Sequence, residues 1–231
     1  MTVREWVART TAKLDALPRT DTPHVRAVGR WLSGELREQP ADLVVDTALA
    51  LLAKDQRLIA CELVQGHEPA LRSLDIGGLE AFGAGMASWH AVDIFSISLA
   101  APCWREGQIS DQDIERWALS EDLWWRRAAL VATTGLNVRK RGGYGDSDRT
   151  LAVARLLVDD REDMVVKALS WALRELIYWE PDRVETFLAE FQDRLAARVK
   201  REVRTKLETG LKSATTRAYP RRSRRDVSAT S

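Results

Sequence analysis

The segment DMVVKALSWALRELIYW, residues 163–179, carries apolar side chains at the spacing of an α-helix. They fall at i, i+3, i+4, i+7, i+8 and i+11, the pattern of a helix with one buried face: Val165, Ala168, Leu169, Ala172, Leu173 and Leu176. A second stripe alternates cations with aromatic rings and consists of Lys167, Trp171, Arg174 and Tyr178. An ordinary solvated face does not favour that alternation, so this stripe is a candidate binding surface.

Helical spacing recurs along almost the whole chain, and no segment shows more than a few residues of the alternation that is typical of strands. RAAL at 127–130 and KALS at 167–170 begin comparable helix cores 40 residues apart, and IAC at 59–61 resembles an earlier copy. A period of about 40 to 47 residues is typical of HEAT and armadillo units. We therefore predict an all-α fold, a curved superhelical stack of antiparallel helix pairs with a concave groove. A plain helical bundle is the alternative.

Length and composition favour one folded domain. The chain has 231 residues, of which 45% are hydrophobic and 30% are charged, which is enough apolar material for a large core. We expect residues 1–212 to form a single repeat domain and residues 213–231 to form a flexible basic tail. No apolar run is long enough to cross a bilayer, and MTVREWVARTTAK at the start lacks the apolar stretch of a signal peptide. We expect a cytoplasmic protein, associated with the nucleoid.

Charge is divided unevenly along the chain, although the total is only +1. Residues 194–225 contain twelve Lys and Arg against two Glu, or +10, whereas residues 1–193 contain 23 basic and 31 acidic residues, or −8. A basic end of this size is typical of a phosphate-binding surface. For RRSRR at 221–225, a solubilising tail is the alternative.

Neither cysteine nor histidine predicts a metal site. Cys61 and Cys103 lack the paired spacing of a structural zinc site, and His24, His67 and His90 stand far apart. We expect no cofactor and no metal.

One carboxylate is a candidate for catalysis. Trp89 and Asp93 lie one helical turn apart, on a face different from the buried stripe of Val92, Phe95 and Leu99. A carboxylate beside an indole, in a groove with little water, can stabilise a developing cation or orient a water molecule. The alternative is that Asp93 caps a neighbouring helix or pairs with an arginine.

The same spacing occurs a second time. Trp171 and Glu175 repeat the tryptophan, three residues, acid pattern, so spacing alone does not favour Asp93 over Glu175. For Glu175, an ion pair with the neighbouring Arg174 is the alternative to a role in the site.

Arginines next to tryptophans are candidates for binding phosphate. SEDLWWRRAALVAT places Trp124, Trp125, Arg126 and Arg127 in the first turns of a helix, where an arginine can donate two hydrogen bonds to one phosphate. Adjacent residues point about 100° apart, so at least one tryptophan should lie in the core. RKRGGYGD at 139–146 lacks the Walker pattern; it is either a phosphate-contacting loop or a surface turn.

Four motifs between residues 88 and 212 resemble one family. SWHAVD at 88–93, DLWWRRAAL at 122–130, KALSWALRE at 167–175 and VKREVRTKLETGLK at 199–212 are similar, in this order, to motifs of the DNA alkylation repair family, the AlkD-type alkylpurine DNA glycosylases built of HEAT-like repeats. The first third of the chain is similar mainly through HVRAVGR at 24–30.

The resemblance implies an enzyme that hydrolyses the N-glycosidic bond of cationic N3- or N7-alkylated purines in duplex DNA and leaves an abasic site. It implies Asp93 as the catalytic carboxylate, Trp89 and Trp171 as residues flanking the lesion, and Arg127 as a phosphate contact. Lys167, Arg174 and Arg126 are further candidates for DNA binding. We expect a monomer whose partner is double-stranded DNA with alkylated purines, with no metal and no membrane.

Two alternatives to a glycosylase remain open at this point. One is a non-catalytic DNA-binding or damage-sensing repeat protein of the same family. The other is a helical-repeat scaffold that binds a peptide of another protein.

Overall fold

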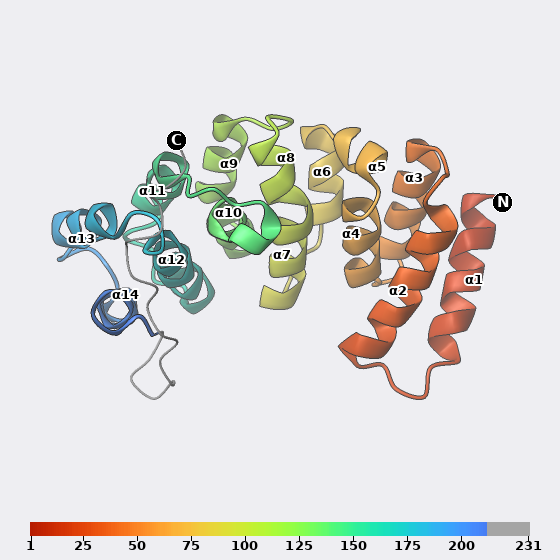
Figure 1. Cartoon of the computed structure of the whole chain (residues 1–231), viewed down its shortest axis with the longest axis horizontal. Coiled ribbons are helices and arrows are strands. Elements are labelled where there is room, and N and C mark those ends of the chain that lie inside the picture. Colours follow the sequence, from red (N-terminus) through yellow and green to blue (C-terminus); the bar gives the residue numbers. More distant parts are fainter. Residues whose placement is uncertain (212–231) are drawn as a thin grey trace, which may run out of the picture.

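The computed structural model describes residues 1–211, whose regular secondary structure consists of helices and contains no strand. The helices follow one another along an arc, from α1 at one end to α14 at the other (Figure 1). The predicted all-α repeat stack is therefore confirmed, and the plain bundle is excluded. The basic tail expected at 213–231 lies outside the described residues.

One row of helices runs the length of the arc, each packed against the next. Its members are α2 (Thr22–Leu36), α4 (Arg57–Gln65), α7 (Trp89–Phe95), α10 (Leu123–Asn137), α12 (Asp163–Leu176) and α14 (Ala197–Thr209). The three sequence copies at 59–61, 127–130 and 167–170 lie in α4, α10 and α12. The faint repeat in the sequence thus marks equivalent helices of this row, which we call the inner row.

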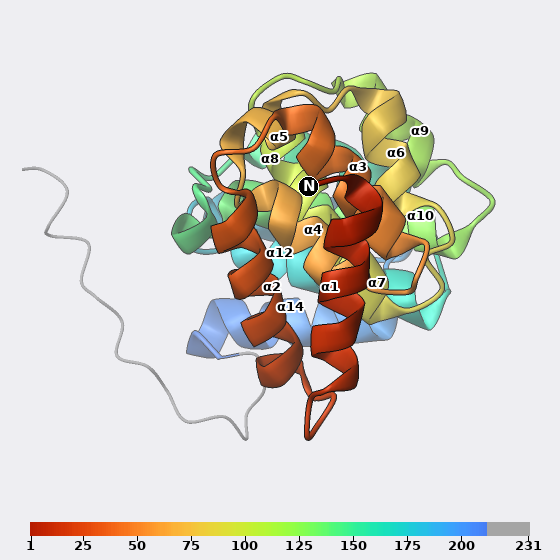
Figure 2. The ribbon, with the colours of Figure 1, turned by 90° about the vertical axis from the view of Figure 1, so that its right-hand side faces the viewer.

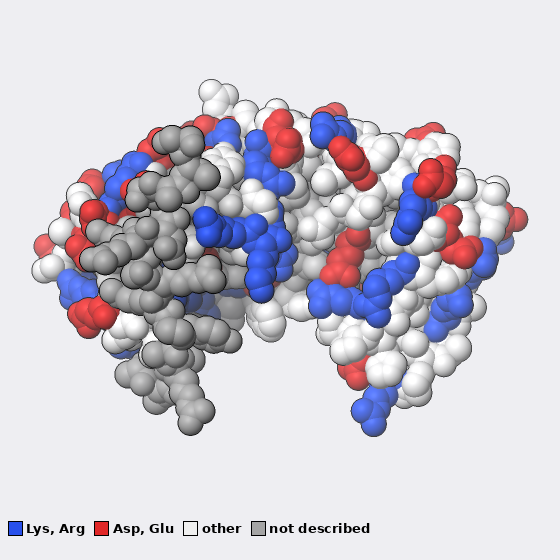
Figure 3. Space-filling model, viewed as in Figure 1, with Lys and Arg blue, Asp and Glu red and all other residues white. Residues whose placement is uncertain are grey.

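The remaining helices alternate with the inner row and form its pair partners. They are α1 (Val3–Asp15), α3 (Ala41–Leu52), α5 (Glu68–Arg72), α6 (Ile76–Gly83), α8 (Ala101–Arg105), α9 (Asp111–Ala118), α11 (Ser147–Leu156) and α13 (Pro181–Glu190). Seen from the N-terminal end, α1 and α2 pack side by side in front of the stack (Figure 2). The space-filling view shows the arc hollowed on one side, with Lys and Arg side chains near the hollow (Figure 3).

Most of the nine tryptophans have a structural role. Trp104 and Trp117 are among the largest fully buried side chains, and their indole N–H groups donate to Asp111 and Glu80, each at 2.7 Å. Trp125 is partly buried and packs edge-on to Phe95. Trp124 is partly buried as well, so the paired tryptophans pack against the core and neither belongs to its fully buried part. An indole N–H without a partner is costly away from water, and among residues 1–211 the buried Trp6 is the exception, because its N–H has no hydrogen-bond partner.

The helical run from Trp89 to Arg105 contains one irregular turn. α7 passes into a π-helical turn, η1 (Ser96–Ala100), and then into α8. Pro102 has no N–H to continue the α-helical bonding, and the N–H of Ala101 donates to the carbonyl of Ser96, five residues back. The expected buried stripe on this run, Val92, Phe95 and Leu99, is confirmed.

Candidate functional site

Asp93 lies on α7, in the middle of the inner row. The helix begins at Trp89 because Ser88 accepts a hydrogen bond from the N–H of Ala91, at 3.2 Å, which satisfies one of the amides left free at a helix start. Trp89 is 54% exposed, whereas the Asp93 side chain is 19% exposed. The carboxylate is therefore half-buried one turn below an indole that faces solvent.

Arg127 of α10 holds the Asp93 carboxylate with two nitrogen atoms. Its Nε and Nη2 lie 3.0 and 2.8 Å from Asp93 Oδ1, and Nη2 lies 3.1 Å from Oδ2. The third nitrogen, Nη1, donates to the carbonyl of Met164 at 2.6 Å. The guanidinium is buried, with 6% of the side chain exposed. Its hydrogen bonds connect three consecutive helices of the inner row, α7, α10 and α12.

The electrostatic environment of Asp93 is set by opposing effects. Burial raises the pKa of the Asp93 carboxyl above its usual value, and the charges of Arg127 and His90 and the hydrogen bonds from Arg127 oppose that shift. Burial has the largest effect of these. A poorly solvated carboxylate interacts more strongly with a nearby cation than a carboxylate in water does.

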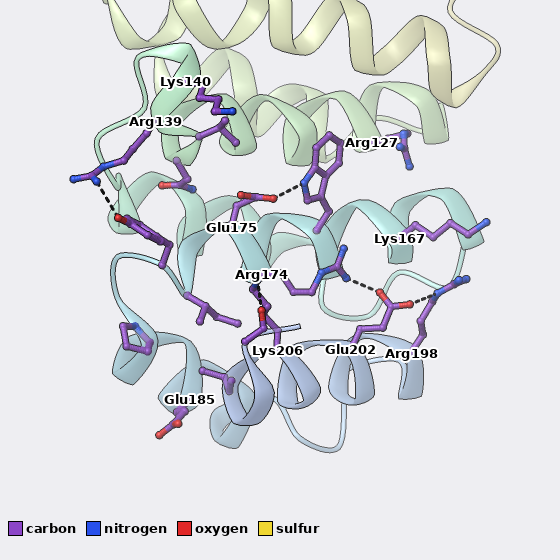
Figure 4. A pocket seen from close by; sticks show the side chains of 18 of the residues that line it. Arg127, Arg139, Lys140, Lys167, Arg174, Glu175, Glu185, Arg198, Glu202 and Lys206 are labelled. Atoms are coloured by element: carbon purple, nitrogen blue, oxygen red, sulfur yellow. Dashed lines mark hydrogen bonds and ion pairs between the residues drawn. The ribbon is translucent and has the colours of Figure 1, made fainter. Parts of the chain in front are cut away.

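A groove of about 1600 Å³ runs along α12, between α10 and α14 (Figure 4). Arg127 and Lys167 lie toward one end of it, and Arg139 and Lys140 lie toward the other. The groove is lined in addition by Trp89, Met164, Trp171, Arg174, Glu175, Tyr178, Glu185, Arg198, Glu202 and Lys206, among others. Asp93 is not among the residues that line the groove, but its partner Arg127 is. The structure thus brings Trp89, Trp171, Arg127, Lys167 and Arg174 to one groove.

The candidate cations differ in how available they are. Lys167 pairs with Asp163 one turn away, at 2.6 Å, and its side chain is 38% exposed. Arg174 is buried and donates to Ser170 and to Glu202 of α14. Burial lowers its pKa, while Glu202 opposes that effect. Lys167 can exchange its partner for a phosphate, whereas Arg174 is held in the packing between α12 and α14.

Arg126 lies outside the lining of the groove. Its Nε donates to Asp160 at 2.8 Å, and its Nη1 donates to the carbonyls of Ser120 and Glu121, at 2.9 and 2.8 Å. All of these contacts tie α10 to neighbouring loops. Arg126 is therefore engaged in the fold, and its expected role in DNA binding stays a prediction.

The glycine-rich loop contributes side chains, not backbone amides, to the groove. The amides of Gly142, Gly143 and Gly145 donate within the loop or to the end of α10. Arg139 donates to the hydroxyl of Tyr178 at 2.9 Å, and its guanidinium lies 5.2 Å from the centre of that ring. Arg139 and Lys140 both line the groove, so any phosphate contact of this loop has to come from these two cations.

Two features of the groove are not visible in the sequence. Glu202 is the central acceptor between α12 and α14, with Ser170, Arg174 and Arg198 as donors. Its only signal in the sequence is its position as a lone acid in the basic segment VKREVRTK. The carbonyl of Met164, which accepts from Arg127, has no signal at all, because any residue supplies a carbonyl.

Fold and groove together define a helical-repeat protein whose inner surface combines aromatic rings, cations and a partly buried carboxylate. The family described as DNA alkylation repair enzyme matches residues 20–207. The chain therefore belongs to the DNA alkylation repair enzyme family. No curated protein and no solved structure matches it significantly. None of the helices among residues 1–211 is long and apolar enough to span a membrane.

Proposed function

We propose that this protein is a DNA glycosylase that releases cationic N3- or N7-alkylated purines from duplex DNA and leaves an abasic site. The observation that carries the proposal is the Asp93 carboxylate, held by Arg127 at 2.8 Å beside a groove lined by two indoles, in a member of a DNA alkylation repair family. Family membership supports DNA as the substrate, and the groove supports a specific chemistry on it.

The chemistry follows from the charge of the lesion. An alkylated purine already carries a positive charge and is a good leaving group, so the enzyme does not need to protonate it. As the glycosidic bond breaks, positive charge develops on the deoxyribose. Asp93 stabilises that charge and orients the attacking water, while the electron-rich faces of Trp89 and Trp171 attract the cation. No cofactor takes part in these steps.

The roles of the cations follow from their contacts. Arg127 holds Asp93 in place and lines the groove. Its contact with a phosphate of the damaged strand rests on the family resemblance, because all three of its nitrogen atoms already donate within the protein. Lys167, Lys140 and Arg139 provide further contacts with the backbone. Phosphate contacts of this kind position a duplex and make its binding sensitive to salt.

A release assay tests the proposal. The purified protein is incubated with duplex DNA that contains 7-methylguanine, without added metal, and the free base is quantified. We expect release by the wild type and none above the uncatalysed background by Asp93→Asn, with duplex affinity changed less than about threefold. Release by Asp93→Asn at the wild-type rate would rule out the catalytic role of Asp93.

A non-catalytic DNA-binding protein is the second candidate. The observation that favours it is the closed ion pair, in which both oxygens of Asp93 already accept from Arg127. Such a protein would bind duplex in a salt-dependent manner and release no base, so the same assay separates the two functions.

A further inference from the structure

Glu175 is a second carboxylate in the groove, and its contacts differ from those of Asp93. It lies on α12 one turn after Trp171, and both residues line the groove. The indole N–H of Trp171 donates to Glu175 Oε1 at 3.0 Å (Figure 4). Within residues 1–211, the Glu175 side chain makes no other hydrogen bond.

The hydrogen bonds between α12 and α14 do not involve Glu175, although its negative charge raises the pKa of the adjacent Arg174. An ion pair with the adjacent Arg174 was one of the two expectations, but Arg174 donates instead to Ser170 and Glu202, on the side of α14. Ser170, Arg174, Arg198 and Glu202 thus form a hydrogen-bonded cluster between α12 and α14, and Glu175 is not among them. Its carboxylate faces the groove, and its partner is the ring that also faces the groove.

The two groove indoles are held differently. Trp89 is exposed and makes an edge contact with His90 at 5.8 Å, and within the described part of the chain its N–H has no hydrogen-bond partner. Trp171 is half-buried, and its N–H is fixed by a charged acceptor. Hydrogen bonds to a charged group are stronger than neutral ones, so the orientation of the Trp171 ring is set before any ligand arrives.

We propose that Glu175 is a positioning residue that fixes the plane of the Trp171 indole and makes its face more electron-rich for a cationic alkylated nucleotide. The second part rests on the function proposed above. Because hydrogen-bonded groups polarise one another, a carboxylate at the N–H edge increases the electron density of the ring. A cation is then bound more strongly over its face.

The orientation of the ring is tested without any activity. The indole N–H signal of Trp171 is assigned in a ¹⁵N–¹H spectrum by its loss in Trp171→Phe. In Glu175→Ala we expect this signal to move upfield, toward the position of an indole bonded to water. In Glu175→Gln, whose amide oxygen still accepts, it should move by less than half as much. An unmoved Trp171 signal in Glu175→Ala overturns the proposal.

The electronic effect is tested by release of 7-methylguanine under single-turnover conditions. A misplaced group in an active site can lower the rate by one to two orders of magnitude, and we expect a loss of about tenfold in the rate constant for Glu175→Ala. Glu175→Gln should retain the orientation and lose about threefold through the missing charge. Glu185→Ala is the matched control, since Glu185 is another acid of the groove without a hydrogen bond or ion pair among residues 1–211.

The outcomes of the two experiments distinguish the effect of Glu175 on the orientation of the ring from its effect on base release. Equal losses in Glu175→Ala and Glu185→Ala would mean that only the total charge of the groove matters, which overturns the proposal. If the wild type releases no base, the proposed function fails, and the Trp171 signal alone then decides whether Glu175 fixes the ring.

Discussion

Arg127 donates to both carboxylate oxygens of Asp93 across 34 residues of sequence, with its Nη2 at 2.8 and 3.1 Å. The same guanidinium donates to the carbonyl of Met164 at the start of the next inner helix. One buried side chain therefore both holds the Asp93 carboxylate and joins three helices. The position of Asp93 thus depends directly on the packing of the repeats.

Substitution of Arg127 should destabilise the fold as well as the site. Breaking a buried ion pair costs about 3–5 kcal/mol, because the remaining charge is left without a partner, and Arg127→Ala also leaves the Met164 carbonyl unpaired. We expect the free energy of unfolding in urea to fall by about 3 kcal/mol. The control is Arg72→Ala, which removes an exposed pair with Glu68 and should cost less than about 1 kcal/mol. Equal effects of the two variants would contradict a structural role for the buried pair.

Base release should depend on pH through Asp93. The proposed mechanism needs the ionised carboxylate, and burial raises its pKa above the usual value. Release should therefore rise with pH along an acidic limb whose midpoint lies above about pH 4, the ordinary value for aspartate. The charge of Arg127 lowers the pKa, so Arg127→Gln should move the limb to higher pH.

The measurement is the single-turnover rate between pH 4 and 8, corrected for uncatalysed loss of the base. A limb at or below the ordinary aspartate value, or one that Arg127→Gln shifts to lower pH, is inconsistent with this account of Asp93.

Glu202 should make stability dependent on acid pH. Burial raises its pKa, but the hydrogen bonds from Ser170 and Arg198 and the charges of Arg174 and Arg198 outweigh burial and lower it. A lowered pKa in the folded state means that the stabilisation is present above the unfolded value of 4.5 and is lost as pH falls through the folded value.

We expect Glu202→Gln to lower the free energy of unfolding by about 1–3 kcal/mol at pH 7, since buried donors lose a charged acceptor. Near pH 3 the difference from the wild type should narrow, because the wild-type carboxyl is then being protonated. Glu185→Gln should show no comparable pH dependence. A difference that stays constant from pH 7 to pH 3 argues against the role of the ionised carboxylate.

Replacing either of two helical glycines by alanine should change the stability of the fold, in opposite directions. A Cβ at Gly135 of α10 would overlap the Cβ of Ala101, whereas a Cβ at Gly34 of α2 meets no atom within 4 Å. Overpacking a core costs about 1–3 kcal/mol, so Gly135→Ala should destabilise by that amount. Gly34→Ala should stabilise by about 0.5–1 kcal/mol, because the unfolded chain loses freedom. Chemical unfolding checks both, and stabilisation by Gly135→Ala would show that α10 and α8 can move apart freely.

The repeat architecture follows from the sequence because apolar periodicity is a local signal. The stripes on α12 and on the run after Trp89 fix which side of each helix is buried, and a copy every 40 residues aligns α10 with α12. The exact start of a helix is less well determined by residue type, because Asp146 and not the adjacent Ser147 is the N-cap of α11.

The partners of the site residues could not be derived from the sequence. Trp89 and Asp93 share a face because they lie one turn apart, but the choice of Arg127, and not Arg126, as the partner of Asp93 depends on the rotation of α10 against α7. Likewise the identical spacing of Trp171 and Glu175 leads to a different contact, because no arginine of α14 reaches Glu175. Tertiary packing decides among chemically equivalent neighbours, and one sequence contains little information about it.

The salt dependence of duplex binding should identify the cations that contact phosphate. Each contact with B-DNA contributes about 0.9 to the slope of log K against log salt. Lys140 lines the groove and has no ion pair within residues 1–211, and Lys167 lines it with an exchangeable partner. We expect Lys140→Ala and Lys167→Ala each to reduce the slope by about 0.9. The control is Lys54→Ala, which removes an exposed lysine outside the groove and should leave the slope unchanged.

Binding measured by fluorescence anisotropy from 50 to 300 mM salt gives the slopes. Equal slopes for all three variants would mean that the duplex binds elsewhere on the protein, and absence of binding at every salt concentration would favour a scaffold for another protein.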